Sequence, residues 1–283
     1  MRTKSFNIVT ILNYTFFMLI NIAMIYPFWY VLMYSLSDPL LKSFSHHYLT
    51  PIGFTLDSYI KVFQQNMVYT GFMNSIIITV VGTVIGLIIT KTMAYPISRE
   101  GLASKKHIFA LIMFTMIFNG GTIPTYLVVK AYGLVNNIWA LILIPTVSVY
   151  NILVMMKFFK NIPGSLIESA KIDGYNDMSI LFKIVIPLSK PVIATIALFF
   201  AVMYWNSFLG GLIYINDSSK WPLQVVLRQL LTETTSSSTT DMRVSTETVN
   251  MATVMVTIAP IMAVYPFLQK YFVKGIMLGA VKG

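Results

Sequence analysis

Long apolar stretches alternate with short polar connections along the chain, and this alternation predicts its elements. A helix needs about 20 mostly apolar residues to cross the hydrocarbon core of a membrane, because backbone groups left unpaired in lipid are costly. Six stretches reach this length, at 8–36, 72–97, 108–129, 137–157, 190–215 and 249–272. We therefore expect an all-α membrane protein in which residues 1–283 form one transmembrane domain with six transmembrane helices.

The Lys and Arg residues are divided unevenly between the two sides of this arrangement. An even number of spans puts both termini on one side, and positive residues near span ends are retained in the cytoplasm. Fourteen of the 20 Lys and Arg residues fall on the side of the termini. Both termini are therefore predicted to be cytoplasmic, which leaves the loops 37–71 and 216–248 outside.

The second of these outer loops contains a Ser/Thr-rich segment, 232–248, with little apolar content. Such a composition is typical of a flexible linker, but it also suits a loop that docks on a partner. Both interpretations remain open.

The composition excludes several classes of function. Only 11% of the residues are charged, against roughly 25% in an average soluble domain. The net charge of +10 comes from residues in short loops rather than on one solvated face, so nucleic-acid binding is not expected. There is no cysteine, no phosphate-binding G-x-x-x-x-G-K-[ST] loop and no H-E-x-x-H metal spacing. We expect a chain that is not an enzyme and that binds neither a cofactor nor a metal itself.

Neutral polar and aromatic residues, rather than charges, occupy the predicted spans. The 10 Asp and Glu residues lie in loops or at span ends, so nothing resembles the proton relay of a gradient-driven carrier. Neutral groups in spans can hydrogen-bond a passing hydroxylated solute, or they can link neighbouring helices. The candidates for a substrate pathway are Asn119, Tyr150, Asn151, Tyr204, Trp205 and Asn206.

Gly82 and Gly86 form a small-xxx-small pair in the second span. Pairs of this kind let two helix backbones approach closely in lipid, so helix packing is their predicted role.

A polar segment between the fourth and fifth apolar stretches carries its own helix signals. Ser165 stands three residues before Glu168, the spacing of a capping box, and Gly174 supplies a stop signal. These signals predict a cytoplasmic helix over about 165–174, which is too short to be stable alone in water.

Two roles for this helix remain open on physical grounds. It is either an ordinary connector or a helix that docks in a groove of another protein. In the docking interpretation, the apolar contacts would come from Ile167, Ala170, Ile172 and Ile180, and the two prolines Pro187 and Pro191 would turn the chain back into the fifth span.

The same segment carries a resemblance to a known family. ESAKIDG at 168–174, followed by Phe182, Ile184, Pro187 and Pro191, resembles the EAA motif of ABC importer permeases, E-A-A-x-x-D-G with a downstream F-x-I-x-x-P-x-x-x-P. The form is that of the carbohydrate-uptake group, which includes the maltose permeases. NSIIITVVGTVIG, AYPISR, FNGGTIPTYLVVKAYGL and WN occur in the expected order as well. The terminal YPFLQKYFVKGIMLGAVKG is similar to that of permeases that pair with an oligosaccharide-binding lipoprotein.

The resemblance implies a type I ABC importer permease fold with a cytoplasmic coupling helix. The residues implied in coupling to the ATPase are Glu168, Ser169, Ala170, Asp173, Gly174 and Tyr175, with Ser169 in place of the central Ala and Tyr175 in place of a common small residue. The tail residues implied to face the ATPase are Lys274, Gly275, Lys282 and Gly283.

The resemblance also implies partners and a location. The chain would be one permease subunit in the cytoplasmic membrane of a bacterium, paired with a second homologous permease subunit. Two ATPase subunits would bind ATP and Mg, and an extracellular solute-binding lipoprotein would deliver a sugar, with an oligosaccharide from a polysaccharide favoured. The alternative is a stand-alone secondary carrier or channel that moves solute without an ATPase.

Overall fold

A computed structural model describes residues 8–39, 41, 49–102, 104–234, 247–264 and 266, and the regular elements of these residues are helical. They fall into two compact units. Unit 1 comprises the described residues of Met1–Tyr69 and Leu227–Ala259, and unit 2 those of Thr70–Val226 and Pro260–Gly283.

The helices differ widely in length. Those of eight residues or more are α1 (Ile8–Ser35), α2 (Asp57–Gln64), α3 (Asn66–Ser98), α4 (Lys105–Ile117), α5 (Thr122–Ala131), α7 (Val149–Lys160), α8 (Gly164–Ile172), α11 (Lys190–Trp205), α13 (Leu223–Thr234) and the helix Glu247–Val264. The shorter ones are α6 (Ile138–Leu143), α9 (Asp177–Ile180), α10 (Ile186–Leu188) and α12 (Leu209–Tyr214).

Three of the described helices are long and apolar enough to cross a membrane unbroken: α1, α3 and Glu247–Val264. Three further candidate spans are pairs of helices bent at a short break, which brings the number to six if each pair is one span. The bend is 114° between α4 and α5, 47° within Ile138–Lys160 and 84° before α11.

The breaks interrupt stretches that the apolar pattern alone treats as continuous. Stretch 108–129 is divided at Phe118–Gly121, where the chain reads Phe-Asn-Gly-Gly. Stretch 190–215 contains α11 and α12 with a turn between them. A hydropathy pattern detects apolar length but not helix direction, which explains why the break at Phe118–Gly121 and the turn between α11 and α12 were not expected.

Close helix packing organises the interior of unit 2, where α3 lies against α11. A Cβ atom added at Gly82 would stand 2.5 Å from the Tyr204 ring, and one at Gly86 would stand 2.9 Å from the Phe200 ring. The predicted packing role of the glycine pair is confirmed. The cluster around these rings continues through α6 and α7 to Phe159 at the far end of α7.

In unit 1, the end of α1 is held by polar contacts while most of its length presents apolar side chains outward. The Tyr34 hydroxyl donates to Glu247 Oε2 at 2.7 Å, and Ser35 Oγ lies 2.7 Å from the hydroxyl of Tyr59. Apolar side chains exposed along a helix of this length are expected where the surrounding solvent is lipid.

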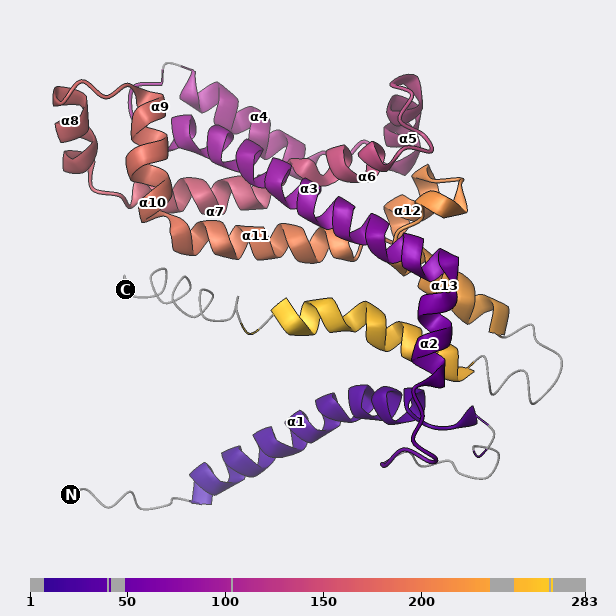
Figure 1. Ribbon diagram of the computed structural model, residues 1–283. Helices are drawn as coiled ribbons and strands as arrows, with labels where there is room; N and C mark the ends of the chain where they lie inside the picture. Colours follow the sequence, from indigo (N-terminus) through magenta and orange to yellow (C-terminus); the bar gives the residue numbers. More distant parts are fainter. Residues whose placement is uncertain are drawn as a thin grey trace. The chain divides into compact units, whose positions relative to one another are not determined.

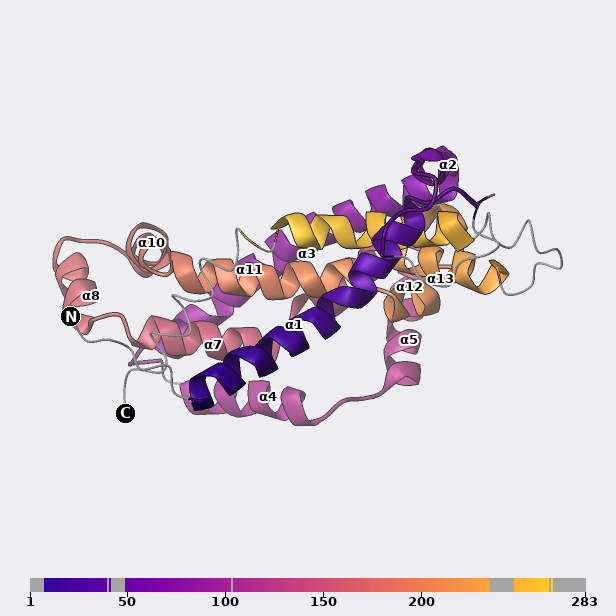
Figure 2. The ribbon, with the colours of Figure 1, turned by 90° about the horizontal axis from the view of Figure 1, so that it is seen from below.

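Unit 2 has two distinct ends. In both views α8 and α10 lie at the end opposite α5 and α12 (Figures 1 and 2). The first end carries the polar segment with the motif, and the second carries loops that join the apolar helices.

Candidate functional site

The helix that carries the motif, α8, is attached to unit 2 by one face. Ile167 and Ala170 are buried and belong to the same apolar cluster as Phe159 and Ile180. Since the isolated helix would be marginal in water, this contact supplies its stability. The helix is therefore fixed on the body of the chain rather than extended from it.

The N-terminus of α8 differs from the predicted capping box. The helix begins at Gly164, one residue before Ser165, and its cap position is Pro163, which makes no side-chain cap hydrogen bond. The first turn is closed instead by the Leu166 N–H, which donates to the Pro163 carbonyl at 3.2 Å. The proline already has the φ of a helix entrance, so Ser165 lies inside the first turn and cannot cap it.

The C-terminus of α8 ends as the glycine predicts. Gly174 has φ +82°, in the left-handed region that favours glycine. The Tyr175 N–H donates to the Ala170 carbonyl at 3.0 Å, and the Gly174 N–H donates to the Lys171 carbonyl at 3.1 Å. This pair of bonds is the Schellman motif, and it directs the chain sharply away from the helix axis.

The exposed face of α8 is not the one expected from sequence. Ile167, Ala170 and Ile180 point into unit 2, so they are unavailable to a partner, and that part of the predicted contact set is wrong. Ile172, in the last turn, is 86% exposed, and Leu166, in the first turn, is 45% exposed. Sequence reasoning missed Leu166, because periodicity alone does not say which apolar side chain of a short helix meets the core.

Polar motif residues accompany these exposed apolar groups. Glu168, Ser169 and Asp173 are all exposed, and Tyr175 is partly exposed, with the Lys183 amine 4.9 Å from the centre of its ring. Of the six residues implied in coupling, only Ala170 is buried. The exposed residues of this segment thus include the aliphatic Ile172 and Leu166 and the carboxylates of Glu168 and Asp173.

The segment that follows α8 turns the chain back toward the membrane. Asn176 caps α9 through its side-chain oxygen, which accepts from the Ser179 N–H at 2.8 Å. A π-helical turn, Leu181–Val185, leads into α10, and the chain then bends by 84° at Ser189 into α11. Pro187 and Pro191 flank this bend, as predicted, and neither can donate a backbone hydrogen bond across it.

Two of the candidate pathway residues pack between helices. Tyr204 is 1% exposed, and its hydroxyl donates to the Ile142 carbonyl at 2.8 Å. The ring of Trp205 is buried at 6.0 Å from that of Phe72, edge to face. In this conformation both residues connect α11 to neighbouring helices instead of facing an open path.

The other four candidates lie in different settings. Asn151 is buried on α7, whereas Tyr150 beside it is exposed. Asn119 is exposed at the break after α4, where its side-chain oxygen accepts from the Gly121 N–H at 2.9 Å. Asn206 is exposed at the end of α11. The structure does not bring the six candidates together, and their pathway role stays a prediction.

Some predicted features lie outside the described residues. These are the ATPase-facing tail residues Lys274, Gly275, Lys282 and Gly283 and the greater part of the Ser/Thr-rich segment, 235–246.

A family comparison covers most of the chain that carries these features. Residues 102–278 match the family model described as "Binding-protein-dependent transport system inner membrane component". The match includes α8, its motif and the turn back into α11.

Individual relatives extend the similarity to almost the whole chain. The Bacillus subtilis "Polygalacturonan/rhamnogalacturonan transport system permease protein YtcP" is 41% identical over 96% of this chain and 97% of its own length. "Protein LplC" of the same organism is 42% identical over 100% of this chain and 97% of its own. The "Melibiose/raffinose/stachyose import permease protein MelC" from that organism is 29% identical over 100% of this chain and 99% of its own.

A solved structure shares the fold. It is described as the "Crystal structure of a bacterial ABC transporter involved in the import of the acidic polysaccharide alginate". One of its chains matches with a TM-score of 0.88 and 30% sequence identity, covering 96% of this chain and 99% of that one.

Proposed function

This chain belongs to the family of binding-protein-dependent transport system inner membrane components, and from this premise we propose that it forms half of a solute pathway and couples to ATPase subunits through α8. An ABC importer permease is not itself an ATPase; it works with an ATPase, a second permease and a binding protein. Because members of this family work in ABC importers, we set aside the alternative of a stand-alone carrier or channel.

The observation that carries the coupling proposal is the two-faced packing of α8. Its buried face, Ile167 and Ala170, joins the apolar cluster of unit 2, while Ile172 is exposed on the opposite side and Leu166 is partly exposed at the edge of the buried face. Exposed aliphatic side chains on a helix of nine residues are unfavourable in water. A groove on an ATPase subunit would cover them, and any movement of that subunit would reach the bundle through the buried face.

The coupling proposal implies a mechanical cycle. ATP and Mg bound by two ATPase subunits would close those subunits on each other. The closure would displace the two α8 helices, one from each permease subunit, and rock the bundle from an inward-facing to an outward-facing state. This chain would contribute α8 and the packed helices. It has no phosphate-binding loop of its own, so the energy would come from the ATPase subunits.

The proposed orientation places α8 and both termini in the cytoplasm. Its support is the excess of Lys and Arg on that side, which the positive-inside rule associates with the cytoplasm. The tail that includes Lys274 and Gly283 would then be on the same side as the ATPase, and the loop 216–248 would meet the extracellular binding lipoprotein.

The proposed cargo is an oligosaccharide derived from a polysaccharide. The relatives named above carry polygalacturonan, rhamnogalacturonan, melibiose, raffinose and stachyose in their names, and the similar structure is of an alginate importer. A binding assay on the partner lipoprotein with a panel of neutral and acidic oligosaccharides would identify the class of sugar.

Replacing Ile172 with Glu tests the coupling directly. Because Ile172 is 86% exposed, the change should leave the fold of this chain intact, and the carboxylate should prevent the apolar contact with the ATPase. We expect recovery of the ATPase with the affinity-purified permease, and ATP-dependent uptake, to fall at least tenfold, the factor for about 1.4 kcal/mol of lost binding.

The matched control is Ile123→Glu, at a residue that is 75% exposed in α5 at the opposite end of unit 2. It should leave recovery of the ATPase unchanged. Recovery and uptake at wild-type levels in Ile172→Glu would show that α8 is not the coupling element.

A further inference from the structure

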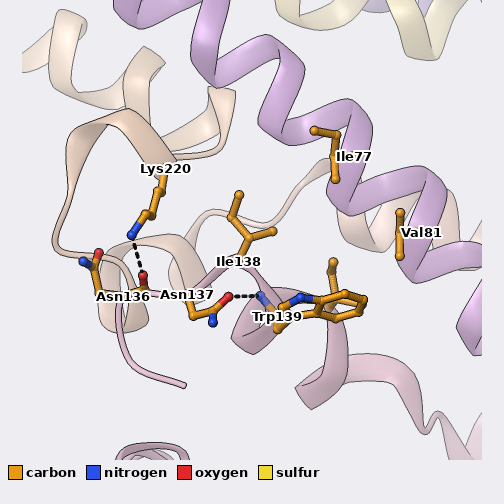
Figure 3. Close-up of a pocket in the computed structure, with 8 residues that line it drawn as sticks. Ile77, Val81, Asn136, Asn137, Ile138, Trp139 and Lys220 are labelled. Carbon is orange, nitrogen blue, oxygen red and sulfur yellow. Dashed lines mark hydrogen bonds between the residues drawn. The ribbon is translucent and has the colours of Figure 1, made fainter. Parts of the chain in front are cut away.

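Figure 3 shows a cavity with a volume of about 410 Å³. All of its lining residues belong to unit 2. The aliphatic part of its lining, here called the floor, comes from α3 and α6: Ile77, Val81, Ile138 and Ile142. The polar and amphipathic part, here called the rim, comes from two loops and the start of α6: Asn136, Asn137, Trp139 and Lys220.

The rim is rigidly built around Asn136. This residue has φ +61°, a left-handed conformation that few residues other than glycine adopt. Its own N–H donates to the Tyr214 carbonyl at 2.7 Å, and its side-chain oxygen accepts from the N–H of Asp217 at 3.0 Å. The loop before α6 and the loop after α12 are therefore fixed to each other at the mouth of the cavity.

The side chains on the rim present donors. The side-chain oxygens of Asn136 and Asn137 already accept backbone N–H groups. The side-chain NH₂ group of each residue therefore remains as a hydrogen-bond donor. The indole of Trp139 can only donate. Lys220 donates to the Asn136 carbonyl at 3.1 Å, and this bond uses one of the three donors of its ammonium group.

Lys220 and Asp217 form an ion pair, but this pair takes no hydrogen-bond donor from the ammonium group. Asp217 Oδ2 lies 3.9 Å from the ammonium nitrogen, which is longer than a hydrogen bond. The other oxygen of Asp217 accepts from the Ser219 hydroxyl and N–H; these two bonds and, to a smaller extent, the Lys220 charge lower the pKa of the Asp217 carboxyl. Asp217 thus orders the turn that carries Lys220, and the ammonium group keeps donors for a ligand.

The floor continues along the exposed apolar surface of α3, a candidate membrane span. Ile77 and Val81 lie on α3, one of the helices long enough to span the membrane, and Ile77 is about half exposed, as are Val80 and Val84 further along the helix. A ligand in this cavity therefore has an acceptor-rich, negatively charged part at the rim and an aliphatic part at the floor.

We propose that this cavity binds a membrane phospholipid. The phosphodiester of the lipid would lie at Lys220 and the two asparagines, and the part of an acyl chain nearest the headgroup would lie against Ile77 and Val81. A phosphodiester supplies acceptors only, which matches a rim of donors and one cation. A tryptophan at the same level is typical of the membrane–water interface. In the proposed orientation this is the outer leaflet.

The same chemistry argues against a sugar as the occupant. Sugar hydroxyl groups both donate and accept, so they are best matched by a mixture of donors and acceptors, whereas most of the remaining polar groups on this rim are donors. Four aliphatic side chains on the floor also favour a hydrocarbon chain over a hydrated ring. An acidic oligosaccharide is the remaining competitor, because its carboxylate could pair with Lys220.

Photocrosslinking distinguishes the two occupants. The assembled transporter would be placed in nanodiscs that contain phosphatidylglycerol with a diazirine on its acyl chain, and the adducts would be mapped by mass spectrometry. We expect adducts at 77–81 and 138–142. Lys220→Gln should reduce their yield roughly tenfold, as for the loss of one hydrogen bond to a charged group.

Two further variants keep the result interpretable. Lys130→Gln removes a positive charge from the last turn of α5 and should leave the adducts unchanged. Ile77→Trp enlarges a side chain that lines the cavity, and it should abolish the adducts at 138–142. Absence of these adducts in the wild type, an unchanged yield in Lys220→Gln, or loss of the adducts on adding an oligogalacturonide would overturn the proposal.

Discussion

At the scale of single residues, Gly82 determines how closely α3 approaches α11. The Tyr204 ring occupies the space where a Cβ would be, and its hydroxyl is bonded to the Ile142 carbonyl. The ring therefore cannot move aside without losing a buried hydrogen bond. Tyr204 was proposed from sequence as a possible sugar contact, and in this conformation its ring instead packs against Gly82.

Gly82→Ala should consequently destabilise the protein by about 1–3 kcal/mol, the usual cost of forcing an extra carbon into a packed core. The measurement is the melting temperature of the purified transporter in detergent, which should fall. Gly120→Ala is the control, because its nearest non-local atom would be Pro124 Cβ at 4.0 Å. Equal melting temperatures for the two variants would contradict the packing account.

At the scale of elements, the two ends of α8 are formed in different ways. Its N-terminus follows Pro163 without a side-chain cap, so the Schellman turn at Gly174 is the stronger of its two end signals. The space around Gly174 is open, so a side chain would meet no atom there. What matters at this position is the left-handed backbone alone.

Gly174→Ala should therefore loosen the end of α8 at a cost of about 1–2 kcal/mol, the penalty for a left-handed conformation at a residue with a Cβ. Limited proteolysis should then cut faster near residues 172–176, and recovery of the ATPase should fall. Gly174→Asn should recover part of both, since Asn tolerates this conformation better.

Gly164→Ala is the matched control for this element. Gly164 also has open space around it, but its φ is not in the left-handed region. If Gly164→Ala and Gly174→Ala were cut at the same rate, the turn would not be what ends the helix.

At the scale of the whole molecule, the two ends of unit 2 present different surfaces. One end carries α8 with its exposed aliphatic side chains, and the other carries the loops that surround the donor-lined cavity. The proposed orientation assigns the first end to the cytoplasm and the second to the outside. The helices between them are packed closely enough to transmit a rigid-body movement.

The absence of cysteine from the sequence allows this orientation to be tested with single labels. Ile172→Cys and Tyr132→Cys replace residues that are 86% and 78% exposed, at opposite ends of unit 2. A membrane-impermeant maleimide should label Tyr132→Cys in right-side-out vesicles and Ile172→Cys in inverted vesicles, with the ATPase stripped off. The reverse pattern would refute cytoplasmic termini.

The sequence by itself determined those features that depend on composition and on short-range backbone preferences. Six apolar stretches follow from the cost of exposing apolar surface or unpaired backbone, and the stop at Gly174 follows from the freedom of a residue without a Cβ. The packing of the Gly82 pair and the turn flanked by Pro187 and Pro191 were predictable for the same reason. The motif of the family was also readable, because it is a linear string.

Only the tertiary structure decided which side chains meet across distance. Ile167 and Ile172 are equally apolar, yet one is buried and the other exposed, because the apolar cluster of unit 2 lies on one side of α8. The contact between Lys220 and Asn136 joins residues 84 positions apart, so no local sequence pattern could predict it. Burial and hydrogen-bond partners depend on the whole packed arrangement, whereas helix formation depends mainly on neighbours in the chain.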